Sequence, residues 1–373
     1  MKKRKIVFIS YSLPGGGVER ILLGILKYLD REKFTPLLVL LNKRGVFLDE
    51  ISKYVEIIDL QKKNKLSFFR LIIDLAFNIY PKIKPDIVFS FLEYCNFINV
   101  LAGMLNFRLK KKIILNVQNY TTSYLNYSKF ILAKKLLLKL LYPKADIITV
   151  SSEGVRSNLI NDFKIKPGKI KVIYNFVDIP LVERLSTDFV DDVDFKKCPV
   201  IIACGRLVHQ KNYPLLLNAF SIVLKKIDAK LFILGDGEER DEIIDLSNKI
   251  GVKDRVNFLG FKKNPFKYIS KSDVFVLSSI YEGFANVIVE AMACGIPVVS
   301  TNCPSGPDEI ITDGINGILV PVGDENAMSD AIIKILTDKD YAKSIADNGR
   351  KRAQDFITEN KVREYEKLFS QNY

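Results

Sequence analysis

Short apolar runs alternate with longer amphipathic stretches along almost the whole chain, and this alternation restricts the fold more than any other feature. The first run, Ile6–Ser10, is followed by Gly15–Gly17 and then by apolar residues at helical spacing, such as Val18, Ile21 and Leu22. A strand, a helix and a strand repeated in this way predict a parallel sheet covered by helices. We expect further strands of this series at Pro36–Leu41, Asp86–Phe91, Ile113–Val117, Asp146–Ser151 and Ile170–Tyr174.

A second series of the same kind follows a stretch of different composition. Residues 179–197 contain Pro180, several aspartates and little apolar periodicity, so we interpret them as a linker. A chain of 373 residues is longer than one core usually supports, so we predict two α/β domains, residues 1–178 and 198–355. Strands of the second domain are expected at Pro199–Cys204, Leu231–Leu234, Val256–Leu259, Val274–Leu277, Pro297–Ser300 and Gly317–Val320.

The composition favours an intracellular protein with an acidic partner. Lysine and arginine number 56 against 43 acidic residues, a net charge of +13. This excess suits nucleic acid, anionic lipid or a phosphorylated small molecule, and an ordinary lysine-rich surface is the alternative. The five cysteines are odd in number and form no C-x-x-C pair, so we expect a reducing, cytoplasmic setting without disulfides or zinc. No apolar run approaches the roughly 20 residues of a membrane span, so any membrane contact is expected at the surface only.

The segment Tyr281–Ser300 has the pattern of a loop, a short helix, a turn and a buried strand. Glu282 and Glu290 would lie about 12 Å apart on one helix, farther than the roughly 5–9.5 Å of a glycosidase acid/base pair. We therefore predict that the two glutamates bind two different parts of one elongated ligand. The phosphates of that ligand would contact the helix N-terminus near Phe284–Asn286. Glu290 could instead be a solvent-facing helical residue, but its apolar neighbours argue against that interpretation.

Three further loops follow predicted strands. Arg206 and Lys211 are five residues apart, and an arginine fork with a lysine charge can hold a diphosphate. The single histidine, His209, lies between them, where a surface or packing role is the commoner one. Leu234–Gly237 and Gly15–Gly17 could approach a ligand closely or form plain turns.

The glycine loop Gly15–Gly17 does not have the pattern G-x-G-x-x-G, which argues against an NAD-dependent oxidoreductase. The Asp-x-Asp at Asp191–Asp194 is interpreted as a solvated acidic loop, and no metal site is expected.

Several motifs stand in the order found in one family. GRLVHQKN, FILGDGEER, EGFANVIVE, ACGIPVVST and GINGILVPVGD together resemble family 4 of the retaining glycosyltransferases, which have the GT-B fold. The resemblance implies two Rossmann-like parallel-sheet domains that face a cleft, with acceptor binding in the N-terminal domain and a nucleotide-sugar donor in the C-terminal domain. It also implies that a helix over Phe356–Tyr373 crosses back to the N-terminal domain. Neither a cofactor nor a metal is implied beyond the donor as co-substrate.

The family also implies roles for individual residues. Arg206 and Lys211 would hold the donor diphosphate, Glu290 the ribose and Glu282 the donor sugar. Gln118 stands where many relatives carry a histidine near the sugar. The remaining expected contacts are the phosphate with Gly283, Phe284, Ala285, Asn286 and Val287, the base with Phe261, the phosphates with Gly16 and Gly17, and the sugar or acceptor with Gln118 and Asn119.

Two segments bear on the acceptor. Cys303–Ile310 resembles relatives that build bacterial surface glycans on lipid carriers. This implies a UDP-hexose or UDP-N-acetylhexosamine donor and a glycan or lipid-linked acceptor in polysaccharide, lipopolysaccharide or glycoprotein glycan assembly. Lys129–Leu141 is a basic, apolar helix that could lie on an anionic membrane, at the inner face of the plasma membrane, or simply pack on its sheet. A basic module that binds nucleic acid or anionic lipid without transferase activity is the alternative function, although no nucleic-acid partner is expected.

Overall fold

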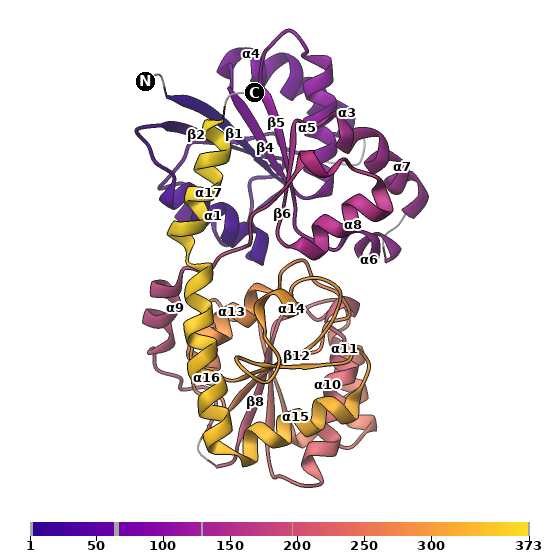
Figure 1. The fold of residues 1–373 in the computed structure, drawn as a ribbon, viewed down its shortest axis with the longest axis vertical. Coiled ribbons are helices and arrows are strands. Elements are labelled where there is room, and N and C mark those ends of the chain that lie inside the picture. Colours follow the sequence, from indigo (N-terminus) through magenta and orange to yellow (C-terminus); the bar gives the residue numbers. More distant parts are fainter. Residues whose placement is uncertain (1–2, 63–66, 128–129, 196, 372–373) are drawn as a thin grey trace. The chain divides into compact units, whose positions relative to one another are not determined.

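The chain folds into two compact units (Figure 1). The computed structural model describes residues 3–62, 67–127, 130–195 and 197–371. The first unit comprises Met1–Phe176 together with Thr358–Tyr373, and the second comprises Val177–Ile357. No helix within the described residues is long and apolar enough to cross a bilayer.

The first unit contains a parallel seven-stranded sheet in the order β3-β2-β1-β4-β5-β6-β7. Its strands are β1 Arg4–Ser10, β2 Phe34–Leu40, β3 Ile57–Asp59, β4 Ile87–Phe91, β5 Lys112–Val117, β6 Ile147–Val150 and β7 Ile170–Val172. The expected parallel sheet is confirmed, with β3 as an addition. That edge strand has three residues, none of them fully buried, so it lacks the continuous apolar run that revealed the others.

Helices connect the strands of the first sheet and cover it. They are α1 Gly17–Tyr28, α2 Leu48–Ile51, α3 Ser67–Ile73, α4 Tyr80–Ile83, α5 Glu93–Leu105, α6 Thr121–Asn126, α7 Ile131–Leu141 and α8 Glu153–Phe163. A π-helical turn, Asp74–Ile79, joins α3 to α4, and 3-10 turns occupy Tyr142–Lys144 and Pro167–Lys169. Because each helix connects two parallel strands, the loops that follow the strands gather at one edge of the sheet, called here its carboxyl edge.

The second unit contains a parallel six-stranded sheet in the order β10-β9-β8-β11-β12-β13. Its strands are β8 Val200–Cys204, β9 Lys230–Leu234, β10 Val256–Gly260, β11 Val274–Leu277, β12 Val298–Thr301 and β13 Ile318–Val320. Its longer helices are α9 Ile179–Ser186, α10 Tyr213–Leu224, α11 Arg240–Lys249, α13 Asn286–Ala293, α15 Glu325–Thr337 and α16 Lys339–Ala353. Single turns are α12 Phe266–Ile269, α14 Pro307–Ile310, His209–Lys211, Lys253–Arg255 and Gln354–Phe356.

The interpretation of residues 179–197 as a linker is wrong. Residues 179–186 form α9, which packs against α12 and α13 of the second unit. Asp178 caps this helix by accepting a hydrogen bond from the Leu181 amide (3.1 Å), and Pro180 occupies its first turn. A proline in the first turn favours a helix start, so the residue interpreted as a linker signal in fact lies in the first turn of a helix. Asp192 is also tied to the unit, by an ion pair with Lys262 (2.6 Å).

The last helix, α17 Thr358–Ser370, belongs to the first unit. Tyr365 and Phe369 are completely buried in the core cluster that contains Phe8, Phe34 and Phe89. The Phe369 ring makes edge contacts with the rings of Phe8, Phe34 and Phe89 at centroid distances of 5.6–6.2 Å. The first core therefore depends on a segment that follows the entire second unit in sequence.

We expect Phe369→Ala to lower the free energy of unfolding of the first unit by about 3–5 kcal/mol, because it leaves a cavity among buried rings. The matched control is Phe189→Ala, whose side chain is 80% exposed and should cost less than about 0.5 kcal/mol. Urea denaturation followed by circular dichroism measures both changes. Equal losses in the two variants would contradict the role assigned to α17.

Candidate functional site

Four loops of the second unit meet at the carboxyl edge of its sheet. They follow β8, β9, β11 and β12. Strand β8 lies between β9 and β11, so the chain leaves β8 toward one side of the sheet and later returns to its other side. In open parallel sheets this change of direction separates the loops and leaves room for a ligand. The loops after β8 and β11 carry the residues that the sequence singled out.

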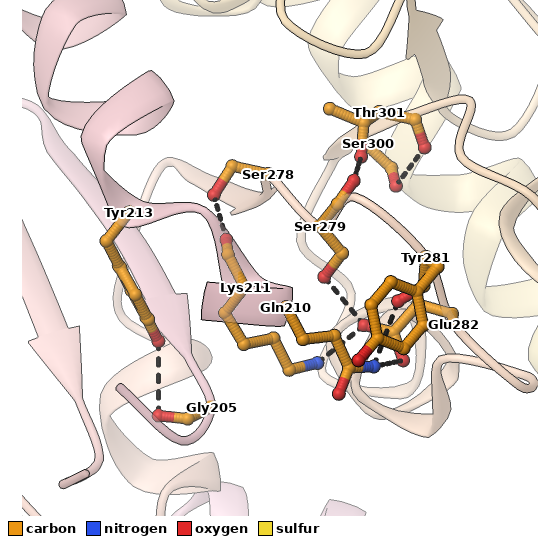
Figure 2. Close-up of polar contacts among 10 residues, drawn as sticks. All are labelled: Gly205, Gln210, Lys211, Tyr213, Ser278, Ser279, Tyr281, Glu282, Ser300 and Thr301. Atoms are coloured by element: carbon orange, nitrogen blue, oxygen red, sulfur yellow. Dashed lines mark hydrogen bonds and ion pairs between the residues drawn. The ribbon is translucent and has the colours of Figure 1, made fainter. Parts of the chain in front are cut away.

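A buried ion pair joins these two loops (Figure 2). The Lys211 Nζ lies 2.6 Å from the Glu282 Oε1, and the two side chains are only 14% and 8% exposed. Lys211 ends the 3-10 turn after β8, whereas Glu282 lies in the loop between β11 and α13. At this burial an unpaired charge would be costly, so the pair favours the arrangement in which the two loops meet.

Two residues that sequence reasoning missed complete the surroundings of the Glu282 carboxylate. The Ser279 hydroxyl donates to its Oε1 (2.6 Å), and the Gln210 amide donates to its Oε2 (3.4 Å) and to the Tyr281 carbonyl (2.9 Å). Figure 2 shows these donors converging on the carboxylate from both loops. Gln210 directly precedes Lys211, and only this adjacency in the sequence indicated that Gln210 could lie at the site.

Further hydrogen bonds lock the two loops together. The Ser278 hydroxyl donates to the Lys211 carbonyl (2.7 Å), and the Ile280 amide donates to the Gln210 carbonyl (2.9 Å). From the neighbouring strand, the Thr301 hydroxyl donates to the Ser279 carbonyl (2.6 Å). The ion pair is therefore held by backbone contacts as well as by its own charges, which restricts the positions of both side chains.

Glycines let the loops after β8 and β9 pack closely. Gly235 has φ +133°, and a Cβ there would collide with the Gly205 carbonyl. At Gly237 a Cβ would collide with the backbone of Leu207. The Tyr213 hydroxyl also donates to the Gly205 carbonyl (3.1 Å). These contacts give the glycine loop after β9 a structural role, and its expected contact with a nucleotide stays a prediction.

The loop before α13 is strained and braced. Ala285 is buried with φ 63°, the left-handed conformation that residues other than glycine seldom adopt. The Ser305 hydroxyl donates to the Gly283 carbonyl (2.9 Å), and Gly306, with φ +99°, lies so close to Phe284 that a Cβ would collide with its backbone. This conformation begins α13 at Asn286.

The two glutamates occupy different elements, whereas the distance of about 12 Å assumed that both lie on one helix. Glu282 lies in the loop, whereas Glu290 lies in the second turn of α13 and is buried. The expected loop, short helix and buried strand are thus confirmed. Arg206 is exposed two residues after β8, and Phe261 is exposed directly after β10. His209 is also exposed, with its Nδ1 3.8 Å from the Glu239 carboxylate.

In the first unit, Gln118 belongs to a buried polar network at the carboxyl edge of the sheet. Its Nε2 donates to the Asn116 Oδ1 (2.7 Å), and its Oε1 accepts from the Asn175 amide (2.7 Å). Asn116 also donates to Thr149 (3.0 Å). The Gln118 amide thus has protein partners at both ends, while Asn119 is half-buried beside it. A contact of Gln118 with a sugar stays a prediction that would use the second hydrogen of its Nε2.

Gly16 and Gly17 begin α1 at the same edge. Gly17 is the first helical residue, and Gly16 caps the helix in an extended conformation. A Cβ on Gly16 would come within 2.8 Å of the Glu19 carboxylate, the movable end of that side chain. Among the residues that the structure describes, no group of three His, Cys, Asp or Glu side chains is arranged to hold a metal ion.

Comparison with known proteins matches both halves of the chain. The family model described as Glycosyltransferase Family 4 matches residues 15–180, and the one described as Glycosyl transferases group 1 matches residues 187–352. The Campylobacter jejuni protein named N-acetylgalactosamine-N,N'-diacetylbacillosaminyl-diphospho-undecaprenol 4-alpha-N-acetylgalactosaminyltransferase is 33% identical over 362 residues, 95% of this chain and 96% of the relative. The amylovoran biosynthesis glycosyltransferase AmsD of Erwinia amylovora is 25% identical and covers 94% of this chain and 95% of its own length.

Solved structures agree on the fold. HepE of Anabaena, solved with UDP and glucose, has a TM-score of 0.82 at 22% identity and covers 98% of this chain and 99% of its own. Sucrose-phosphate synthase from Thermosynechococcus elongatus has a TM-score of 0.81 at 21% identity, with 98% of both chains covered. The expected class, a GT-B fold of two Rossmann-like parallel-sheet domains, is confirmed.

We expect the Lys211–Glu282 pair to show strong thermodynamic coupling. Lys211→Met or Glu282→Gln alone should lower the free energy of unfolding by about 3 kcal/mol, because each leaves a buried charge unpaired. The double variant should cost at least about 1 kcal/mol less than the sum of the two single changes. Urea denaturation of the four proteins gives this coupling energy.

The matched control is the exposed pair Arg255–Asp228, whose atoms approach to 2.7 Å with side chains 44% and 66% exposed. The cycle Arg255→Met and Asp228→Asn should give a coupling below about 1 kcal/mol. If the changes in free energy of unfolding at Lys211 and Glu282 were additive, the two side chains would not be coupled, which would contradict the role assigned to the pair.

Proposed function

Because the chain belongs to the family 4 glycosyltransferases, we propose that it transfers a hexose or N-acetylhexosamine from a UDP-sugar to a lipid-linked glycan acceptor. The resemblance seen in the motifs is confirmed by the family models and by a relative 33% identical over nearly the whole chain. The observation that carries the proposal is the buried Lys211–Glu282 pair beside the N-terminus of α13, at the point where the sheet's connections change direction.

We propose that these groups bind the donor along its length. The amides at the start of α13 and the exposed guanidinium of Arg206 would hold the diphosphate. Lys211 has three N–H donors, so it can bind a phosphate oxygen while still paired with Glu282. Glu290, one turn along α13, would accept hydrogen bonds from the ribose hydroxyls. Glu282 would accept one from a hydroxyl of the donor sugar, and Phe261 would lie against the base.

We further propose a reaction with retention and without a metal ion. The bond between the anomeric carbon and the diphosphate oxygen breaks as the acceptor oxygen bonds to the same face of that carbon. The acceptor proton passes to the leaving phosphate oxygen. Positive charge from Arg206, Lys211 and the start of α13 would stabilise the diphosphate as its negative charge develops. The Lys211 ammonium is fixed before the reaction, so little reorganisation is required.

The relatives support the class of donor and acceptor. HepE binds UDP and glucose in its structure, and the Campylobacter jejuni relative is named for transfer to a diphospho-undecaprenol-linked sugar. We therefore propose a UDP-linked donor, an acceptor on a lipid diphosphate, and a role in bacterial surface-glycan assembly. None of the five cysteines, all within the described residues, forms a disulfide, and we propose a cytoplasmic location.

We expect a screen of UDP-, GDP- and ADP-sugars to identify the donor. A ligand that binds only the folded state stabilises it by about 2.7 kcal/mol at a hundredfold excess over its Kd, so the melting temperature should rise with one UDP-sugar. The screen is read by thermal shift, with free sugars as the control. A shift with GDP- or ADP-sugars alone would refute the proposed UDP-linked donor.

We expect Arg206→Ala and Lys211→Ala each to lower kcat by about 10²–10³-fold, because each removes a positive charge from the leaving diphosphate. Arg206 is exposed, so its variant should fold normally and separate catalysis from stability. The control is Arg184→Ala, an exposed arginine of α9 that should keep full activity. Turnover is measured with EDTA present, and NMR of the product reports its anomeric configuration.

Near-normal turnover in Arg206→Ala and Lys211→Ala would refute the site, and an inverted product would refute the mechanism. The alternative function, a basic binding module, makes a different prediction for Glu282→Gln. If the chain is a transferase, Glu282→Gln should lose sugar transfer. If it is only a binding module, the variant should bind polyanions as the wild type does, and neither protein should transfer a sugar.

A further inference from the structure

One stretch of the first unit holds most of the chain's excess positive charge. Residues 94–145 contain nine lysines and arginines and no aspartate or glutamate, while the whole chain has 56 basic and 43 acidic residues. This basic segment forms most of α5 and all of β5, α6 and α7. Its charge is therefore concentrated on one part of one unit.

Helix α7 turns an apolar stripe outward. Leu132, Leu136 and Leu140 recur every four residues, so they lie on one face, and they are 80%, 58% and 56% exposed. Leu138 and Leu141 are buried on the opposite side. An ordinary surface helix has the reverse arrangement, with its apolar stripe against the core and charges outside. Packing on the sheet therefore explains only the two buried leucines.

Lysines border the leucine stripe. Lys135 and Lys139 each directly precede one of its leucines, and Lys139 is exposed. Lys134 instead points toward the body of the unit, where its Nζ lies 3.6 Å from the Glu93 Oε1, with side chains 31% and 14% exposed. Burial raises the pKa of Glu93, and Lys134 partly offsets that rise. The ion pair and the contacts of α7 with α5 and α6 fix the helix with its leucines outward.

The surface extends beyond α7 at both ends. Phe130, directly before the helix, is 79% exposed. Phe107, after α5, is 78% exposed and is followed by Arg108. Helices α5 and α7 each connect neighbouring parallel strands, so both run away from the carboxyl edge and end at the opposite edge of the sheet. An exposed aromatic side chain therefore lies toward each end of the stripe, and Arg108 follows the one after α5. Lys129 itself lies outside the described residues.

We propose that this surface binds an anionic lipid bilayer, with the leucines of α7 in the interface and the lysines on acidic head groups. An apolar face bordered by lysines provides the two attractions that hold a protein at a membrane surface. Nucleic acid would use the same charges but gains nothing from exposed leucines. The biological role of this membrane binding rests on the proposed function, because a lipid-diphosphate acceptor is held at such a membrane.

The test compares two triple variants with the wild-type chain. Leu132→Ser, Leu136→Ser and Leu140→Ser together remove the stripe from α7. The matched control changes Phe189, Ile315 and Val322 to serine, three side chains of the second unit that are 80%, 56% and 40% exposed. Sedimentation with vesicles of phosphatidylcholine and phosphatidylglycerol gives the partition coefficient, and circular dichroism verifies folding.

We expect wild type and the control to bind, with binding weakened by salt, and the leucine variant to bind at least about tenfold more weakly, because three apolar side chains no longer enter the interface. Lys135→Gln with Lys139→Gln should also weaken binding relative to Lys249→Gln with Lys343→Gln. Three outcomes would overturn the proposal: no vesicle binding at low salt, equal binding of both triple variants, or binding of RNA but not vesicles.

A second copy of the chain is the other candidate occupant of this surface, and sedimentation equilibrium distinguishes it. A dimer that dissociates in the leucine variant but not in the control would overturn membrane binding as the role of the stripe. Sugar transfer to a short-chain acceptor should be unchanged in the leucine variant. The leucine variant should lose vesicle binding and keep sugar transfer, whereas Lys211→Ala should lose sugar transfer and keep vesicle binding. The two variants therefore test the surface and the proposed reaction separately.

Discussion

A buried ammonium group and a buried carboxylate hold together the two loops on which the second unit's site depends. An unpaired charge at this depth would be costly, because the cost of removing an ion from water exceeds most single stabilising contacts, so the pair stabilises the contact between the two loops. Ser279 and Gln210 add hydrogen bonds to the same carboxylate. The Lys211 ammonium is consequently already in place and oriented for the diphosphate binding that we propose, and low local dielectric would strengthen its effect on a bound anion.

The other unusual features of the second unit serve the same arrangement. The left-handed conformation of Ala285 starts α13 at the site, and it persists because Gly306 and Ser305 brace the preceding loop. Gly235 lets the loop after β9 pack on the loop that carries Arg206. The first unit is built on different contacts: a buried amide network around Gln118, and a core completed by the last helix of the chain. The carboxyl edges of the two sheets thus differ in chemistry, with a charged pair in the second unit and neutral polar side chains around Gln118 in the first.

The strands and the site motifs could be predicted from the sequence because they depend on local pattern. A strand buried on both faces gives a continuous apolar run, and a loop after such a strand must lie at the carboxyl edge of a parallel sheet. Arg206, Lys211 and Glu282 could be placed at that edge for this reason. The linker prediction for residues 179–197 fails because α9 has only eight residues and carries Pro180 in its first turn, a pattern that resembles a linker.

The sequence by itself determined two parallel α/β units, the edge at which their functional loops gather, and the family to which the chain belongs. Only the tertiary structure decided that Lys211 pairs with Glu282, 71 residues away, and that the leucines of α7 face outward. Periodicity shows which residues share one face of a helix but not whether another element covers that face. The order of strands in the sheet decides which distant loops become neighbours, and no local pattern encodes that order.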